Sequence, residues 1–145
     1  MTFWRPFAAG VATPTSIRRH DIVAFAFKGD PRADACLHFL VGHTLYISFM
    51  TLAELDRWAV EHDWGETRRE SMREYLKRYA IVPSSRELCL KWAEVTVSAQ
   101  RSGHRIECAD AWIAATALLY NAPLVTHNRR DYLGVPGLTV FSEGS

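Results

Sequence analysis

The segment that decides the fold reads Cys108-Ala109-Asp110-Ala111-Trp112-Ile113-Ala114-Ala115-Thr116-Ala117-Leu118-Leu119. After Asp110, Thr116 is its single polar residue. A helix this apolar is buried on most of its sides, so the Asp110 carboxylate is expected in or beside the core, where an ionised group is costly. An aspartate in a first helical turn also commonly interacts with the helix dipole. Asp110 by itself therefore leaves a functional and a purely structural role open.

Short apolar segments alternate with helical patterns on both sides of this segment. The periodicity predicts helices over 32–41, 51–59, 66–79, 85–103 and 108–120, and strands over 44–49, 81–82, 124–126 and 138–141. A further short apolar segment covers 22–27, and Thr51 with Glu54 has the spacing of a capping box. Strands separated by helices, without hairpin signals, indicate an α/β fold with a parallel sheet.

Composition excludes several classes of protein. The chain has 145 residues, 48% of them hydrophobic and 23% charged, which is typical of one globular domain rather than a disordered or fibrous chain. Its formal charge of +1 gives no global attraction to nucleic acid. The cysteines (36, 89 and 108) have no disulfide or zinc spacing, and no apolar run reaches membrane-span length. We therefore expect a cytoplasmic protein without a membrane partner.

Several polar residues follow the predicted strands. Glu54 comes five residues after strand 44–49, while Asn128 and Asp131 come two and five residues after strand 124–126. Carboxyl ends of parallel strands meet at one edge of a sheet, so we expect these side chains to gather there with Asp110. Converging carboxylates repel one another unless a cation neutralises them, and oxygen ligands favour Mg²⁺ or Mn²⁺. Such a site typically hydrolyses phosphodiester bonds. Taken singly, Glu54 is equally a capping residue and Asp131 a solvated loop acid.

Three motifs resemble those of the PIN-domain nucleases and, within them, of the VapC-type toxins. They are Ile47-Ser48-Phe49-Met50-Thr51-Leu52-Ala53-Glu54-Leu55, Cys108-Ala109-Asp110-Ala111-Trp112-Ile113-Ala114-Ala115-Thr116-Ala117 and Leu124-Val125-Thr126-His127-Asn128-Arg129-Arg130-Asp131-Tyr132. The similarity runs from about Asp21 to the end of the chain. We accordingly expect an irregular segment over 1–20 and a PIN-like domain over 21–145.

The resemblance implies a three-layer α/β/α fold with a short central parallel sheet. It also implies a Mg²⁺- or Mn²⁺-dependent endoribonuclease of a type II toxin–antitoxin system, which forms a homodimer and binds a cognate antitoxin. Glu54 and Asp110 match the glutamate and aspartate of the family. Asn128 stands where many members carry an acid, and Asp131 is the aspartate of the same loop. Which of these two contacts the metal is left open.

The chain departs from the family near its N-terminus. PIN domains open with a strand that ends in Asp-Thr/Ser-Asn/Asp, whereas this sequence has Arg19-His20-Asp21. Arginine keeps its positive charge and opposes a divalent cation. Three explanations follow: an altered N-terminus, Asp21 as a substitute ligand, or a catalytically weakened member. The predicted metal ligands are Asp21, Glu54, Asp110 and Asp131.

Local basic residues provide candidate RNA contacts. Arg129 and Arg130 flank the acidic site and are predicted to contact RNA phosphates. The basic residues of 66–79 are balanced by glutamates, which indicates a solvated face. Two other functions stay open at this point: an inactive PIN-like scaffold that binds the antitoxin, and a small flavodoxin-like ligand-binding domain.

Overall fold

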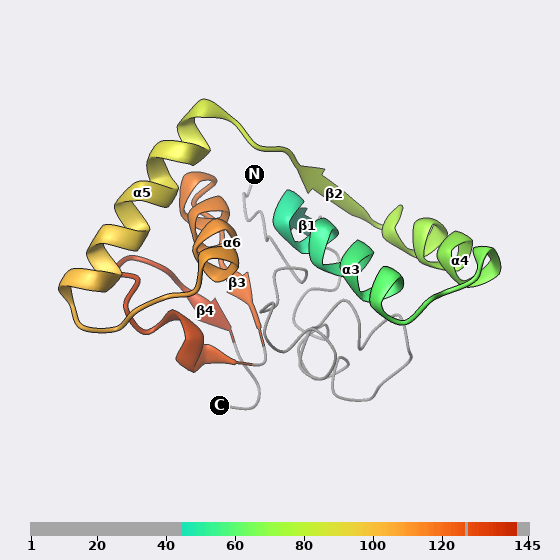
Figure 1. The fold of residues 1–145 in the computed structure, drawn as a ribbon. Coiled ribbons are helices and arrows are strands. Elements are labelled where there is room, and N and C mark those ends of the chain that lie inside the picture. The colour runs from blue at the N-terminus through green and yellow to red at the C-terminus, as the bar shows by residue number, and fades with distance from the viewer. Residues whose placement is uncertain (1–44, 127, 142–145) are drawn as a thin grey trace.

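A computed structural model describes residues 45–126 and 128–141 (Figure 1). Its helices are α3 (Phe49–Glu61), α4 (Glu66–Leu76), α5 (Arg86–Arg101) and α6 (Cys108–Leu119), with a short 3-10 helix, η4 (Arg129–Tyr132). Its strands are β1 (Leu45–Ser48), β2 (Tyr79–Val82), β3 (Leu124–Val125) and β4 (Val140–Phe141). The predictions for the segment 1–20, for Arg19 and Asp21, and for 22–27 and 32–41 lie outside the described residues.

The described strands pair in parallel, as predicted. β1 pairs with β2 in a register that runs from Leu45 opposite Tyr79 to Ser48 opposite Val82. β3 pairs with β4, with Leu124 opposite Val140. Parallel neighbours require crossover connections, and here α3 and α4 connect β1 to β2 while η4 lies between β3 and β4. The ends of β1 and β3 thus lead directly into the elements that carry Glu54 and Asp131.

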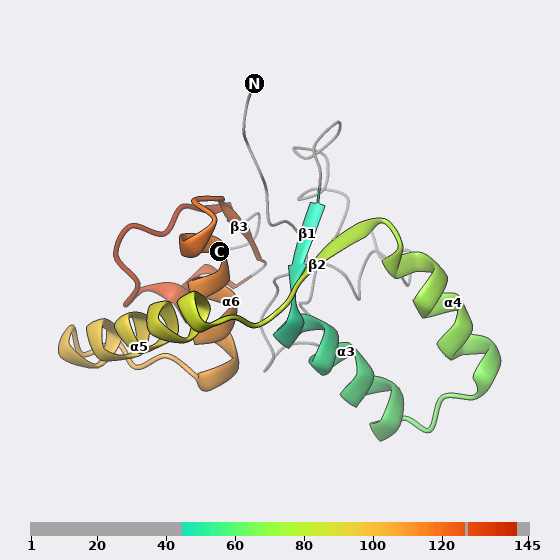
Figure 2. The same cartoon turned by 90° about the horizontal axis from the view of Figure 1, so that it is seen from above.

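The core is centred on α6, as its composition predicts. Six of its residues are fully buried: Ala111, Ile113, Ala114, Ala115, Thr116 and Ala117. Figures 1 and 2 show α5 alongside α6, and Leu88 and Val95 of α5 are buried in the same core cluster. Because four of these six fully buried side chains are those of alanine, neighbouring elements can approach the helix closely.

An aromatic cluster joins α3, α5 and α6. The Trp112 ring of α6 stacks on Trp92 with 5.2 Å between centroids and meets the edge of Phe49 at 5.5 Å. The Trp92 indole N–H also donates to the Cys108 carbonyl at 3.4 Å. These contacts hold the first turn of α3 beside the first half of α6, and so they determine where Glu54 lies relative to Asp110.

The capping box predicted for Thr51 and Glu54 is wrong. Ser48 caps α3: its hydroxyl accepts a hydrogen bond from the Met50 amide at 3.0 Å, and its backbone is extended. The helix therefore begins directly at the end of β1, and Thr51 lies inside its first turn. Ser85 caps α5 in the same way, accepting from the Leu88 amide at 3.1 Å.

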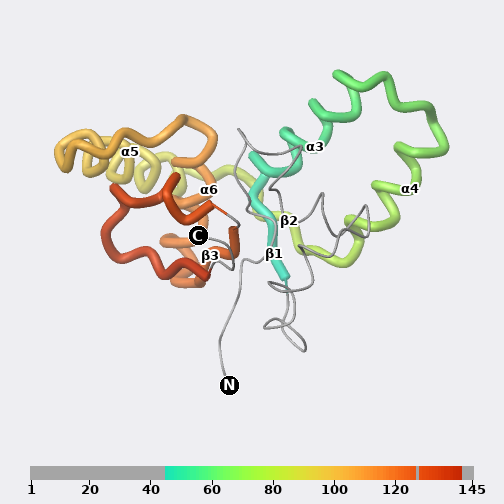
Figure 3. Tube along the Cα trace, turned by 90° about the horizontal axis from the view of Figure 1, so that it is seen from below, coloured from blue at the N-terminus to red at the C-terminus, as the bar shows by residue number. Residues whose placement is uncertain are grey.

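Helix α4 lies on the opposite side of the described structure from α5 (Figures 1 and 3). Its charges are largely paired, since Arg73 bonds to Glu66 and Glu70, and Lys77 lies 2.9 Å from Glu74. This arrangement agrees with the solvated face that the sequence indicates. Within the described residues, no helix combines the length and apolar character that a membrane span requires.

Candidate functional site

The Asp110 carboxylate lies at the centre of the candidate site. Asp110 is the third residue of α6, and its side chain is 1% exposed. The Tyr132 hydroxyl donates to its Oδ1 atom at 3.3 Å. Burial, followed by the charge of Asp131, raises the Asp110 pKa to about 8, although the Tyr132 hydrogen bond opposes this rise. A carboxyl group in such a place holds its proton at neutral pH unless a cation replaces it.

Glu54 approaches this centre from α3. Its side chain is 8% exposed, and burial raises its pKa although the nearby Arg57 guanidinium lowers it. The charge of Glu54 in turn raises the pKa of Asp110. Glu54 lies 56 positions before Asp110 in the sequence, and its effect on the Asp110 pKa is the smallest of the causes that act on that carboxyl.

Asp131 and Asn128 reach the site through η4. Among charged neighbours, Asp131 has the largest effect on the Asp110 pKa. Asn128 precedes η4; its backbone N–H donates to Thr126 Oγ1 at 3.1 Å, and its backbone carbonyl accepts from the Asp131 N–H at 3.2 Å. The backbone of Asn128 thus shapes the turn, while the carboxylate of Asp131 is the group whose charge reaches Asp110.

Glu107 is a neighbour of the site that sequence reasoning missed. It is the N-cap residue of α6, yet its side chain makes no capping hydrogen bond. Its charge raises the pKa of both Glu54 and Asp110. Glu107 and Asp110 are three residues apart, so both side chains lie toward one side of the start of α6. This spacing is the sequence feature from which Glu107 could have been predicted.

The two predicted RNA contacts differ in their surroundings. Both arginines are exposed in η4. Arg129 Nη2 donates to the Val140 carbonyl at 2.9 Å, so this guanidinium ties η4 to β4. Arg130, beside Asp131 in sequence, is the more available of the two for an external phosphate.

The donor set fits a hard divalent cation. Glu54, Asp110 and Asp131 supply oxygen atoms, and their mutual repulsion is relieved when a cation is bound. Within 45–126 and 128–141, no group of three or more His, Cys, Asp or Glu residues stands close enough to hold a metal ion by itself. Mg²⁺ keeps several waters and is usually bound through one or two carboxylates, so two of these acids would be enough to hold it.

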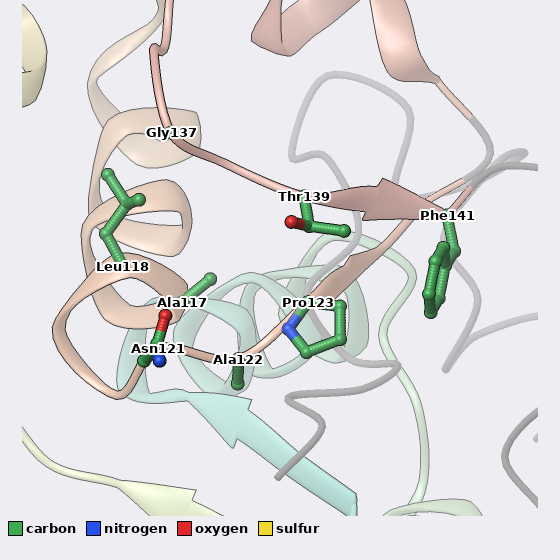
Figure 4. Close-up of a pocket in the computed structure, with 8 residues that line it drawn as sticks. All are labelled: Ala117, Leu118, Asn121, Ala122, Pro123, Gly137, Thr139 and Phe141. Carbon is green, nitrogen blue, oxygen red and sulfur yellow. The ribbon is translucent and has the colours of Figure 1, made fainter. Parts of the chain in front are cut away.

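A separate pocket of about 220 Å³ lies at the other end of α6. Figure 4 shows its lining, which comes from the last turn of α6, the turn at Asn121 and Pro123, and the segment that leads into β4. None of the residues that line it is charged. Asp110 is in the first turn of α6 and this pocket is beside the last, so the pocket is distinct from the acidic site.

A family model for the PIN domain matches residues 21–135. The chain belongs to the PIN domain family. This match confirms the resemblance seen in the three sequence motifs, and it excludes the flavodoxin-like alternative. It spans α3 to η4, and therefore all of Glu54, Asp110 and Asp131.

Relatives of this PIN domain are ribonucleases by name. Ribonuclease VapC1 of Haemophilus influenzae (strain R2866) is 27% identical over 120 residues, which cover 81% of this chain and 90% of the relative. Ribonuclease VapC2 of Rickettsia felis is 28% identical over 96 residues, 66% of this chain and 72% of the relative.

Solved structures confirm the predicted three-layer α/β/α fold. A chain of VapBC2 from Rickettsia felis, crystallised with a promoter DNA fragment, matches with a TM-score of 0.75 at 24% identity, over 90% of this PIN domain and 96% of that chain. A chain of a toxin–antitoxin complex from Klebsiella pneumoniae matches with a TM-score of 0.62 at 27% identity, over 90% and 94% of the two chains.

Proposed function

We propose that this PIN domain is the endoribonuclease toxin of a type II toxin–antitoxin pair and hydrolyses RNA phosphodiester bonds with Mg²⁺ or Mn²⁺. The supporting observation is the buried carboxylate of Asp110, whose pKa is raised to about 8 by burial and by the charges of Asp131, Glu107 and Glu54. Perturbed acids gathered in one place are typical of functional sites, and the named relatives are ribonucleases.

Glu54, Asp110 and Asp131 are the described residues that would hold the cation, with Asp21 as a further predicted ligand. A bound Mg²⁺ or Mn²⁺ supplies a water nucleophile near neutral pH and stabilises the departing oxygen. Tyr132 orients the Asp110 carboxylate through its hydrogen bond. We assign Asp131, rather than Asn128, as the metal ligand of η4 because its charge reaches Asp110.

We assign substrate binding to the exposed guanidinium of Arg130. Arg129 contributes through those of its N–H groups that are not bonded to the Val140 carbonyl. Phosphate contacts of this kind position RNA and carry no sequence information. We also propose a homodimer and a cognate antitoxin as partners. The solved structures with which this chain shares its fold include toxin–antitoxin complexes, which supports the antitoxin assignment.

A second candidate is a PIN-like protein with weakened or no catalysis that keeps its antitoxin-binding surface. The observation that favours it is Arg19, which stands where the family has its leading aspartate. A fixed positive charge at a ligand position would weaken divalent metal binding.

Cleavage of a structured RNA by the purified chain, with Mn²⁺ and then with excess EDTA, distinguishes the two candidates. We expect cleavage with Mn²⁺, none with EDTA, and none by Asp110→Asn under either condition. Equal cleavage by Asp110→Asn would point to a contaminating nuclease. Absence of cleavage together with stable binding of the antitoxin would establish the scaffold.

A further inference from the structure

The hydroxyl of Thr51 is a buried polar group whose hydrogen bonding the fold does not explain. Thr51 is 0% exposed, and its Oγ1 atom finds no hydrogen-bond partner in the structure as described. Buried side-chain oxygens in folded proteins almost always have a partner, and an exception commonly marks the place of an ordered water or ion. Thr51 therefore requires a specific explanation.

Several other hydroxyls in helices or at their ends bond to carbonyls of the same helix. Thr116 donates to the Trp112 carbonyl at 2.8 Å, Thr96 to the Trp92 carbonyl at 3.0 Å, and Ser102 to the Ala99 carbonyl at 2.9 Å. Thr51 lies only two residues inside α3, so the residue four positions earlier, Ile47, belongs to β1 and not to a preceding helical turn. For this reason Thr51 does not make the hydrogen bond to a carbonyl four residues earlier in its own helix that Thr116 makes.

The position of Thr51 places its hydroxyl on the acidic side of α3. Thr51 and Glu54 are three residues apart and both are buried, so they share one face of the helix. Helix α3 contacts α6, and the charge of Glu54 is one of the causes that raise the pKa of Asp110. The Thr51 hydroxyl therefore shares the buried face of α3 with a carboxylate that acts on Asp110.

We propose that Thr51 is a positioning residue of the metal site, whose hydroxyl binds a water molecule in the hydration shell of the divalent cation. Mg²⁺ and Mn²⁺ retain waters when carboxylates bind them, and a hydroxyl can both accept from and donate to such waters. The inference rests on the proposed function, because it assigns Thr51 to the cation that Glu54, Asp110 and Asp131 would hold.

Three variants of the full chain test this assignment. Thr51→Val replaces the hydroxyl with a methyl group of similar size, and Thr51→Ser keeps the hydroxyl and removes the methyl group. Thr116→Val is the matched control, since Thr116 is equally buried but its hydroxyl is bonded within α6. Two quantities are measured for each variant: Mn²⁺ affinity, from the electron paramagnetic resonance signal of free Mn²⁺, and the urea midpoint of the metal-free protein.

We expect Thr51→Val to weaken Mn²⁺ binding roughly tenfold, as removal of an outer-sphere partner typically does, without lowering the metal-free urea midpoint. Thr51→Ser should bind Mn²⁺ like the unmodified chain, and Thr116→Val should leave Mn²⁺ affinity unchanged. Unchanged Mn²⁺ affinity in Thr51→Val overturns the inference alone. A lowered midpoint or failure to fold in Thr51→Val, rescued by Thr51→Ser, also overturns it, because the hydroxyl then has a structural partner. If the unmodified chain binds no Mn²⁺, the proposed function itself fails and the inference with it.

Discussion

The Tyr132 hydroxyl donates a 3.3 Å hydrogen bond to Oδ1 of Asp110, and so connects η4 to the first turn of α6 within the core. Tyr132 is 3% exposed and Asp110 is 1% exposed. The bond favours the ionised carboxylate and opposes the rise in pKa that burial causes. It also places Asp131, the residue before Tyr132, where its charge reaches Asp110. One contact thereby brings together two of the proposed metal ligands.

Tyr132→Phe removes this hydrogen bond and keeps the aromatic ring in place. We expect the Asp110 pKa to rise further, because the ionised form loses a donor, and Mn²⁺ affinity at neutral pH to fall roughly three- to tenfold. Isothermal titration with Mn²⁺ at several pH values measures the change. The loss should shrink as the pH rises, since Asp110 then ionises without help. An identical loss at all pH values would indicate displacement of η4 instead.

The stability of the metal-free protein should decrease with increasing pH. The folded-state pKa of Asp110 is about 8 against the usual 3.8 of an aspartate carboxyl, so between these values the unfolded chain releases a proton that the folded chain retains. The stabilisation is complete below about pH 4 and is lost as the pH rises through about 8, with a limiting slope of about 1.4 kcal/mol per pH unit.

Urea denaturation in EDTA of the unmodified chain and of Asp110→Asn measures this effect. The amide of Asp110→Asn cannot ionise, so this variant should lack that part of the pH dependence and be the more stable protein at about pH 8. Saturating Mn²⁺ should stabilise the unmodified chain at that pH and leave Asp110→Asn unaffected. Parallel pH profiles of the two metal-free proteins would contradict the burial of a protonated Asp110.

Glu107→Gln removes an exposed charge whose field reaches two buried acids. The pKa of Glu54 and that of Asp110 should both decrease, because Glu107 raises both. We expect Mn²⁺ binding to reach half-saturation at a lower pH, and the shift to decrease in high salt as an exposed charge is screened. Glu94→Gln is the control, since Glu94 is an exposed residue of α5 that pairs with Lys91 at 3.2 Å. The same shift in both variants would attribute the effect to net charge alone.

Arg130→Ala should weaken RNA binding without affecting folding. Loss of one phosphate contact reduces the slope of log affinity against log salt by about 1, and affinity decreases similarly for all RNA sequences. Filter binding with the catalytically silent Asp110→Asn background measures affinity without cleavage. Lys77→Ala, at the C-terminal end of the distant helix α4, removes the same charge and should leave the slope unchanged. Arg129→Ala should additionally lower the thermal midpoint, because it breaks the bond to the Val140 carbonyl.

Periodicity and end signals in the sequence predicted the described α-helices and strands in their order, but they extended the helix of 66–79 into β2 and did not predict η4. The apolar run of α6 required burial on most sides, and the structure buries six of its residues completely. The absence of hairpin signals predicted parallel strands, and β1 with β2 and β3 with β4 are parallel. These predictions succeeded because they depend on local spacing and on which side chains avoid water.

The candidate site could be predicted in its residues but not in its interactions. Strand ends and motifs identified Glu54, Asp110 and Asp131. The capping role expected for Thr51 failed because Ser48, three residues earlier, starts α3 directly at the end of β1. Glu107 was missed because an exposed glutamate at a helix start is ordinarily a solvated or capping residue, and its three-residue spacing from Asp110 is a weak signal by itself.

The sequence alone determined the elements, the parallel pairing and the identity of the acids, since each follows from short-range patterns of polarity and from motifs. Only the tertiary structure decided how these groups interact: that Tyr132 bonds to Asp110, that Arg129 is occupied by Val140 while Arg130 is exposed, and that the Thr51 hydroxyl is buried without a partner among the described residues. The physical reason is that a pKa, a hydrogen bond and the desolvation of a charge depend on which atoms packing brings within a few ångströms. Short-range sequence patterns do not show which distant residues will be brought together in this way.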